Sequence, residues 1–201
     1  MAKETGAAVA GLVLAPGASA GRDQSCLVAI DTELSSHGVR VERIDFPYHL
    51  AGRRAPDRAP VLVATVVAAA EALAAALAVE RGRIALGGRS MGGRMCSMAV
   101  ADGLPAAGLV LISYPLHPPG KPERLRTEHL GSLTVPCLFV SGTRDAFGTP
   151  AELEAATASI PGPVTHVWIE GGDHGLKGKD VPVTEAVRTW VIDIPSPKIH
   201  I

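Results

Sequence analysis

Ser90 lies in the segment GRSMG at 88–92, with a glycine two positions before it and another two positions after it. A serine hydroxyl is a weak nucleophile unless the backbone holds it in a tight, exposed turn beside a base. The flanking glycines leave room for such a turn where strand and helix backbones pass close together. The pattern alone has little weight in a chain with 22 glycines, but here a short apolar strand precedes it and a helix-compatible run follows. We therefore predict that Ser90 is a nucleophile; the alternative is a serine that caps a helix N-terminus.

Asp145 and His174 are the predicted partners of Ser90. Each comes just after a predicted strand, and the chain order is Ser, Asp, His. An imidazole can take the serine proton and return it to the leaving group, and a carboxylate behind it fixes the tautomer and stabilises the imidazolium. The alternatives are a turn-forming aspartate and a surface-loop histidine. Asp173 also competes for the role of the acid, but its adjacency to His174 makes the required side-chain geometry awkward.

An oxyanion hole would complete this chemistry, because negative charge on a carbonyl oxygen needs donors already in place. The backbone N–H of Met91, at the start of the helix after Ser90, is one expected donor. The second is expected from the loop after the first strand, where we choose Ala18 because Gly17 lets that backbone approach closely.

These residues require strands and helices that alternate along the chain. Continuous apolar strands of this kind form a parallel sheet with helices on both faces, and ligands bind at the carboxyl ends of the strands. We predict an α/β fold of about six mostly parallel strands in a single domain over 1–201, without a sizeable lid because 115–134 is too short for one. The expected strands are 9–15, 39–45, 83–87, 109–113, 135–141 and 164–169, and the expected helices are 22–37, 61–79, 91–101, 149–159 and 181–192.

Two apolar segments resemble membrane-targeting sequences. The run 7–15, followed by Ala18-Ser19-Ala20, resembles a signal peptide, but Glu4 is out of place in a cationic leader, so we favour a buried first strand. The run 61–79 is long enough to span a bilayer, but its alanines supply little transfer energy. We interpret it as a helix packed on the sheet, and expect no membrane association.

The composition of the chain argues against several classes of partner and cofactor. The formal net charge of −1 argues against a nucleic-acid partner. Three scattered cysteines favour a reducing compartment, so we expect a cytoplasmic protein with buried thiols. The seven histidines lack metal-ligand spacing, and no cofactor or metal is expected.

With this order of strands, helices and candidate catalytic residues, the chain resembles the α/β-hydrolase superfamily, in particular its small dienelactone-hydrolase-like branch. The segments 88–94, 114–121 and 142–148 (GRSMGGR, YPLHPPGK and GTRDAFG) are similar to those of a subgroup that includes testis-expressed hydrolase-like proteins and a hydrolase-like subunit of a chromatin acetyltransferase complex. The resemblance implies a triad of Ser90, Asp145 and His174. The chain departs from the family pattern in two ways. Many relatives carry His-Gly where this chain has Pro16-Gly17. Dienelactone hydrolases proper use a cysteine nucleophile, whereas this chain has Ser90, so their substrate does not carry over.

The expected function is a serine hydrolase, carboxylesterase-like, that cleaves a small acyl ester through an acyl-enzyme. The alternatives are a non-catalytic binding or scaffold protein with a retained hydrolase fold, or a thioesterase or acyltransferase. The oligomeric state is left open.

Positive charge near Ser90 would suit an ester that bears a carboxylate. Arg89, Arg94 and the pair Arg53-Arg54 are candidates, with pairing to structural acids as the alternative reading. Further residues that follow strand ends are candidate pocket walls, namely Tyr48, His49, Tyr114 and His117.

Overall fold

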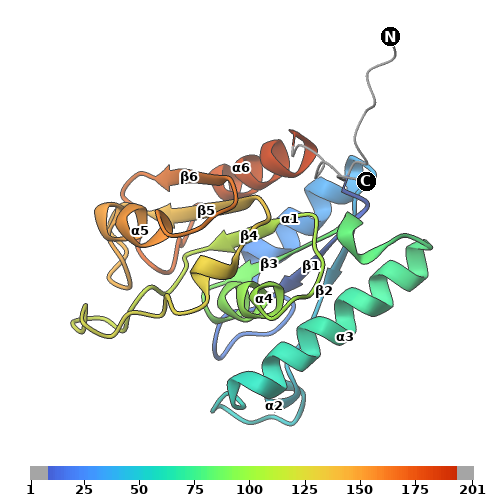
Figure 1. Cartoon of the computed structure of the whole chain (residues 1–201), viewed down its shortest axis with the longest axis horizontal. Helices are drawn as coiled ribbons and strands as arrows, with labels where there is room; N and C mark the ends of the chain where they lie inside the picture. The colour runs from blue at the N-terminus through green and yellow to red at the C-terminus, as the bar shows by residue number, and fades with distance from the viewer. Residues whose placement is uncertain (1–8, 194–201) are drawn as a thin grey trace.

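Six strands form one parallel sheet in the order β2-β1-β3-β4-β5-β6 (Figure 1). The computed structural model describes residues 9–193. Every neighbouring pair of strands is parallel, as the run of apolar segments predicts. The strands are β1 (Gly11–Ala15), β2 (Arg40–Arg43), β3 (Ile84–Arg89), β4 (Leu109–Ile112), β5 (Cys137–Gly142) and β6 (Val164–Ile169).

Helices cover both faces of this sheet (Figure 1). Alternate residues of a strand point to opposite faces, so Leu12 and Leu14 pack with α1 and α6, whereas Val13 packs with α3 and α4. Burial on both faces explains why the inner strands β1, β4 and β5 are almost entirely apolar rather than alternating. The edge strands β2 and β6 are only partly buried, and they carry polar side chains. The helices are α1 (Ser25–Ser36), α2 (Pro47–Leu50), α3 (Ala59–Leu77), α4 (Met91–Ala101), α5 (Pro150–Thr157) and α6 (Asp180–Asp193).

From residue 9 onward, both segments that resemble membrane-targeting sequences belong to the sheet and its covering layer; residues 7 and 8 of the first segment lie outside the described residues. β1 lies inside the sheet between β2 and β3, and all five of its residues are buried, which confirms the predicted strand. Within the described residues α3 is the one helix long and apolar enough to cross a membrane. One side of α3 packs into the core through Leu62, Val66 and Leu73, as predicted for a helix that covers a sheet.

The differences from the predicted elements are small and local. The sequence did not predict the four-residue helix α2, which begins at Pro47, or the short 3-10 turns η1 (Arg81–Arg83) and η2 (Leu130–Ser132). Between β4 and β5 the described chain has η2 and no α-helix, so this loop carries no helical lid over the sheet. The loops that follow β1, β3, β5 and β6 meet at the carboxyl edge, where the predicted site residues lie.

Candidate active site

Ser90 occupies a sharp turn between β3 and α4. Its backbone has φ 50° and ψ −115°, a sparsely populated conformation for a residue with a side chain. Such strain costs roughly 1–3 kcal/mol and persists only where the surrounding structure imposes it. Here the N–H of Ser90 donates to the carbonyl oxygen of Ile112 at 2.8 Å, which anchors the turn to the end of β4.

The two flanking glycines are required by a neighbouring strand. A Cβ atom on either Gly88 or Gly92 would overlap with the carbonyl oxygen of Ala15, at the end of β1. The sequence predicted that backbones pass close together at this turn, and the structure shows that the backbone close to it is that of β1. The loop with Ala18 follows directly after β1. The glycines thus fix the position of Ser90 relative to that loop.

Ser90, His174 and Asp145 form a continuous hydrogen-bonded chain. Ser90 Oγ lies 2.8 Å from His174 Nε2, and His174 Nδ1 lies 3.0 Å and 2.9 Å from the two carboxylate oxygens of Asp145. With a proton on Nδ1 donated to Asp145, Nε2 is free to accept the serine proton. The structure therefore brings together the three side chains that the sequence analysis selected.

Asp145 is held by its own loop after β5. Its side chain is almost fully buried, and Oδ1 also accepts the backbone N–H of Phe147 at 2.8 Å. The Phe147 ring stacks on the His174 imidazole, with 3.9 Å between ring centroids and 24° between planes. Phe147 is a residue to which the sequence analysis gave no role, although it lies in the segment 142–148 on which the family resemblance partly rests.

Asp173, the competing acid, points elsewhere. It is exposed, and its Oδ1 accepts the backbone N–H of Leu176 at 3.0 Å. Its carboxylate therefore stabilises the loop after β6, and Asp145 is the acid that contacts the imidazole.

The loop after β1 leaves one backbone donor free next to Ser90. The N–H of Gly17 donates to Gln24 Oε1 at 3.2 Å, and the N–H of Ser19 donates to the Tyr48 hydroxyl at 3.2 Å. The N–H of Ala20 donates to the Gly17 carbonyl. Among the described residues no partner accepts the N–H of Ala18.

The backbone N–H of Met91 also has no hydrogen-bond acceptor among the described residues. Met91 is the first residue of α4, and the first N–H groups of a helix have no intrahelical acceptor. Met91 and Ala18 both line the cavity that contains Ser90. Two unpaired backbone donors thus lie at the wall of one cavity, from the two segments where donors were predicted.

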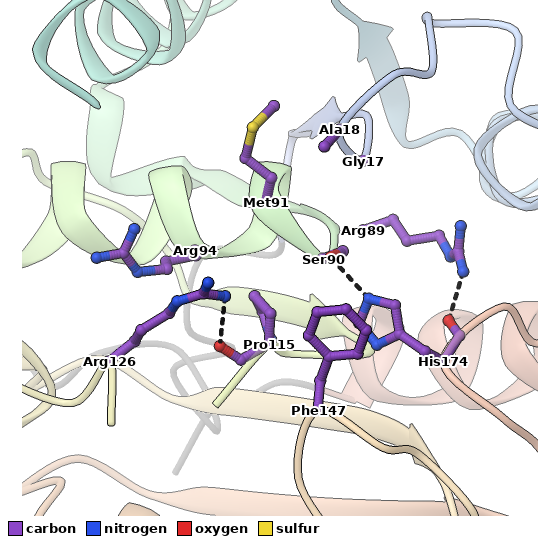
Figure 2. A pocket seen from close by; sticks show the side chains of 10 residues that line it. All are labelled: Gly17, Ala18, Arg89, Ser90, Met91, Arg94, Pro115, Arg126, Phe147 and His174. Carbon is purple, nitrogen blue, oxygen red and sulfur yellow. Dashed lines mark hydrogen bonds between the residues drawn. The ribbon is translucent and has the colours of Figure 1, made fainter. Parts of the chain in front are cut away.

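The cavity has a volume of about 440 Å³ and opens over Ser90 and His174 (Figure 2). Its size is near the lower end of the roughly 300–1,000 Å³ typical of small-molecule sites. Its lining holds three arginines and no acidic residue, and is made of Gly17, Ala18, Arg89, Ser90, Met91, Arg94, Pro115, Arg126, Phe147 and His174.

Arg89 lines the cavity but is directed to the loop that carries His174. Its guanidinium donates to the His174 backbone carbonyl, on the far side of the imidazole from Arg94 and Arg126 (Figure 2). This contact connects the residue before the nucleophile to the base. Arg53 and Arg54 lie outside the cavity: both are exposed, and Arg53 pairs with Asp57 at 2.7 Å.

The other candidate wall residues do not line the cavity. Tyr48 is fully buried and accepts the Ser19 N–H, so its place is behind the β1 loop. Tyr114 is also buried and donates to the Arg126 carbonyl at 2.7 Å, and His117 is buried with its Nε2 3.5 Å from Glu152. Bulky side chains after strand ends are buried here because the loops fold back over them. His49 is exposed beside Asp45.

The thiols lie away from this chemistry. Cys26, Cys96 and Cys137 are free and buried, and burial raises the pKa of Cys26 to about 11 and those of Cys96 and Cys137 to about 12. Within the described residues no group of three histidine, cysteine or acidic side chains is placed to hold a metal ion.

A parallel sheet that carries a serine at a strained strand-to-helix turn, with a histidine and an acid on later loops, defines the class of α/β hydrolases. The family model described as "Alpha/beta hydrolase domain" matches residues 8–188, which is most of the chain. The chain therefore belongs to this family. The resemblance to its dienelactone-hydrolase-like branch stays a prediction. The narrower resemblance to the testis-expressed and chromatin-complex subgroup stays a prediction.

Solved structures share the fold at low sequence identity. Dienelactone hydrolase from Anabaena variabilis is 18% identical with a TM-score of 0.74, over 94% of this chain and 88% of that one. Est1E from Butyrivibrio proteoclasticus is 18% identical with a TM-score of 0.75, over 95% and 90%. An alpha-beta serine hydrolase homologue from Coxiella burnetii is 17% identical with a TM-score of 0.73, over 92% and 86%.

Proposed function

We propose that this protein is a serine hydrolase that cleaves small carboxylic esters. Ser90 Oγ attacks the ester carbonyl carbon while His174 Nε2 takes the hydroxyl proton. The tetrahedral intermediate collapses to an acyl-serine, and the alcohol leaves with the proton from His174. Water, activated by the same imidazole, then hydrolyses the acyl-enzyme and restores Ser90. Asp145 keeps the imidazole in the required tautomer and stabilises its protonated form.

The negative charge of the intermediate is stabilised by the backbone N–H groups of Met91 and Ala18. Their lack of protein partners supports this role, because a donor already used elsewhere has nothing to offer an oxyanion. The neighbouring N–H groups of Gly17, Ser19 and Ala20 are occupied, and Tyr48 and Gln24 hold that loop in place. Removal of one such donor typically costs a factor of about 10²–10³ in rate.

The observation that carries the proposal is the 2.8 Å contact between Ser90 Oγ and His174 Nε2 at a turn with positive φ. A helix-capping serine, the alternative, would accept a backbone N–H of the first turn, but no side-chain cap of this kind is formed by Ser90. The cavity volume of about 440 Å³ supports a small substrate, and the membership in a hydrolase family supports hydrolysis as the reaction. Three buried free thiols support a reducing compartment, and we propose a cytoplasmic location.

A fluorophosphonate probe tests the proposal directly, because it labels only an activated serine. We expect the wild type to be labelled and to hydrolyse p-nitrophenyl butyrate. Ser90→Ala should abolish labelling and lower kcat/KM by roughly 10⁴-fold or more, since only transition-state binding is left. Ser132→Ala, an exposed serine in η2, is the matched control and should retain both. Equal labelling of the wild type and Ser90→Ala would refute the assignment.

A further inference from the structure

Two arginines from distant segments share one wall of the cavity. Arg94 comes from the first turns of α4, four residues after Ser90, and Arg126 comes from the loop between β4 and β5. Their side chains lie next to one another on the side of Ser90 opposite to Arg89 (Figure 2). The sequence offered no spacing that relates them, because the contact is made only when the loop folds over α4.

In the described part of the chain, no carboxylate neutralises this pair. Among the described residues neither Arg94 nor Arg126 forms an ion pair, and the half-buried Arg94 has a buried Nε without a hydrogen-bond partner. Arg126 uses Nη1 to donate to the Pro115 carbonyl at 3.2 Å. Burial lowers the pKa of Arg126, and the positive charge of Arg94 lowers it further. Two adjacent, partly desolvated cations repel each other, so an anion between them would be stabilised.

The backbone around the pair is anchored by buried polar groups. Ser97, fully buried, contacts the Arg94 carbonyl at 2.8 Å and His129 Nε2 at 2.7 Å. Tyr114 donates to the Arg126 carbonyl at 2.7 Å. Burial and the positive charge of Arg94 lower the pKa of His129, which disfavours a third positive charge beside the pair. The two guanidiniums are therefore carried by segments fixed to the core.

We propose that Arg94 and Arg126 bind a carboxylate carried by the ester substrate, so that the site prefers monoanionic esters to neutral ones. This inference rests on the proposed esterase function, which supplies the ester bond at Ser90. Guanidinium groups suit a carboxylate because their planar, fixed donors match its two oxygens. Arg89 contributes positive potential from the other side of His174 but keeps its hydrogen bond to that loop.

Paired esters that differ only in charge test this preference. For the acyl side, mono-p-nitrophenyl adipate is compared with p-nitrophenyl hexanoate; for the alcohol side, 4-acetoxybenzoate is compared with its methyl ester. We expect Arg126→Gln to lower kcat/KM for the charged member roughly 10- to 100-fold more than for its neutral partner. The pair that shows the effect identifies which half of the substrate carries the carboxylate. Arg124→Gln removes an exposed positive charge of the same loop that lies outside the cavity but also acts on Arg126. It controls for a general loss of positive potential, and should change the ratio far less than Arg126→Gln.

Two further variants keep the test decisive. Arg94→Gln should lower the same ratio even if Arg126→Gln fails to fold, and Arg126→Lys should preserve part of the preference because it keeps the charge without the fork of donors. Unchanged charged-to-neutral ratios in Arg94→Gln and Arg126→Gln would overturn the carboxylate site, while loss of all turnover in Ser90→Ala would still support the esterase. Absence of wild-type labelling and of turnover on every ester would refute both.

Discussion

At the scale of single residues, the candidate site depends on a few hydrogen bonds that leave little freedom. His174 is held from three directions, by the Asp145 carboxylate, by the stacked Phe147 ring and by Arg89 at its backbone carbonyl. Asp145 is buried, and its donors among residues 9–193 are His174 Nδ1 and the Phe147 N–H. A carboxylate in that position must meet a protonated Nδ1, which makes Nε2 the acceptor for Ser90.

Asp145→Asn tests this arrangement. The amide would present an N–H₂ to Nδ1, favouring the tautomer in which Nε2 carries the proton and cannot accept one from Ser90. We expect kcat for p-nitrophenyl butyrate to fall by about 10³–10⁴-fold with the fold intact. Steady-state kinetics and a circular dichroism melt measure the two properties.

Asp173→Asn is the matched control, because it makes the same substitution next to His174 at an exposed side chain. It should leave kcat almost unchanged. If Asp173→Asn lost as much activity as Asp145→Asn, the acid would have been assigned to the wrong residue.

At the scale of elements, the turn between β3 and α4 is shaped as much by β1 as by its own sequence. The carbonyl of Ala15 occupies the space that a Cβ atom of Gly88 or Gly92 would fill. This close approach also brings the loop after β1, with the free N–H of Ala18, near the first turn of α4. A side chain at either glycine would therefore displace the two donors relative to each other.

Gly92→Ala measures the importance of this contact. The new methyl would overlap with backbone atoms of Ala15 and Pro16, which cannot move away as a flexible side chain can. We expect a loss of about 2–4 kcal/mol in the free energy of unfolding. We also expect kcat to decrease in the fraction that folds. Urea unfolding and ester kinetics provide the readouts.

Gly82→Ala provides the comparison, since nothing lies within 4 Å of a Cβ atom added there and Gly82 has no positive φ. That variant should be neutral or slightly more stable, because alanine restricts the unfolded chain. A Gly92→Ala protein as stable and active as Gly82→Ala would show that the approach of β1 is unimportant.

At the scale of the whole molecule, the site is a small cavity at the carboxyl edge of a sheet without a helical lid in its described part. The loop between β4 and β5 contributes Pro115 and Arg126 to the cavity wall. The Tyr114 side chain, at the start of this loop, is buried in the core instead. The cavity wall has one aromatic ring besides the histidine, that of Phe147. Such a site offers little apolar surface to a long acyl chain.

We therefore expect p-nitrophenyl acetate and butyrate to be hydrolysed with higher kcat/KM than p-nitrophenyl palmitate. The comparison is made below the micelle concentration of each ester, with Ser90→Ala as the blank. Faster turnover of palmitate would leave the assignment of Ser90, His174 and Asp145 standing, but it would refute the argument from cavity size.

The sequence by itself determined the order of the elements and three positions of the candidate site. Burial on both faces makes the inner strands of a parallel sheet almost uniformly apolar, so the strands predicted at 109–113 and 135–141 could be found without tertiary information. The structure has them as Leu109–Ile112 and Cys137–Gly142. Ser90, Asp145 and His174 could be selected because each lies in the loop or turn that follows a strand, and the ends of parallel strands meet at one edge. Turns and strand ends depend on neighbouring residues in the chain, so they can be predicted from local sequence patterns.

Only the tertiary structure decided which neighbouring side chains share the cavity. Tyr48, Tyr114 and His117 also follow strand ends, yet their rings are buried beneath the loops. Arg126 enters the wall because the loop between β4 and β5 folds back over α4. The fold thus places Arg94 and Arg126 in one wall, although they are 32 positions apart and no periodic signal relates them. The direction that a loop side chain takes depends on what the rest of the fold leaves open to it, and this information is absent from local sequence patterns.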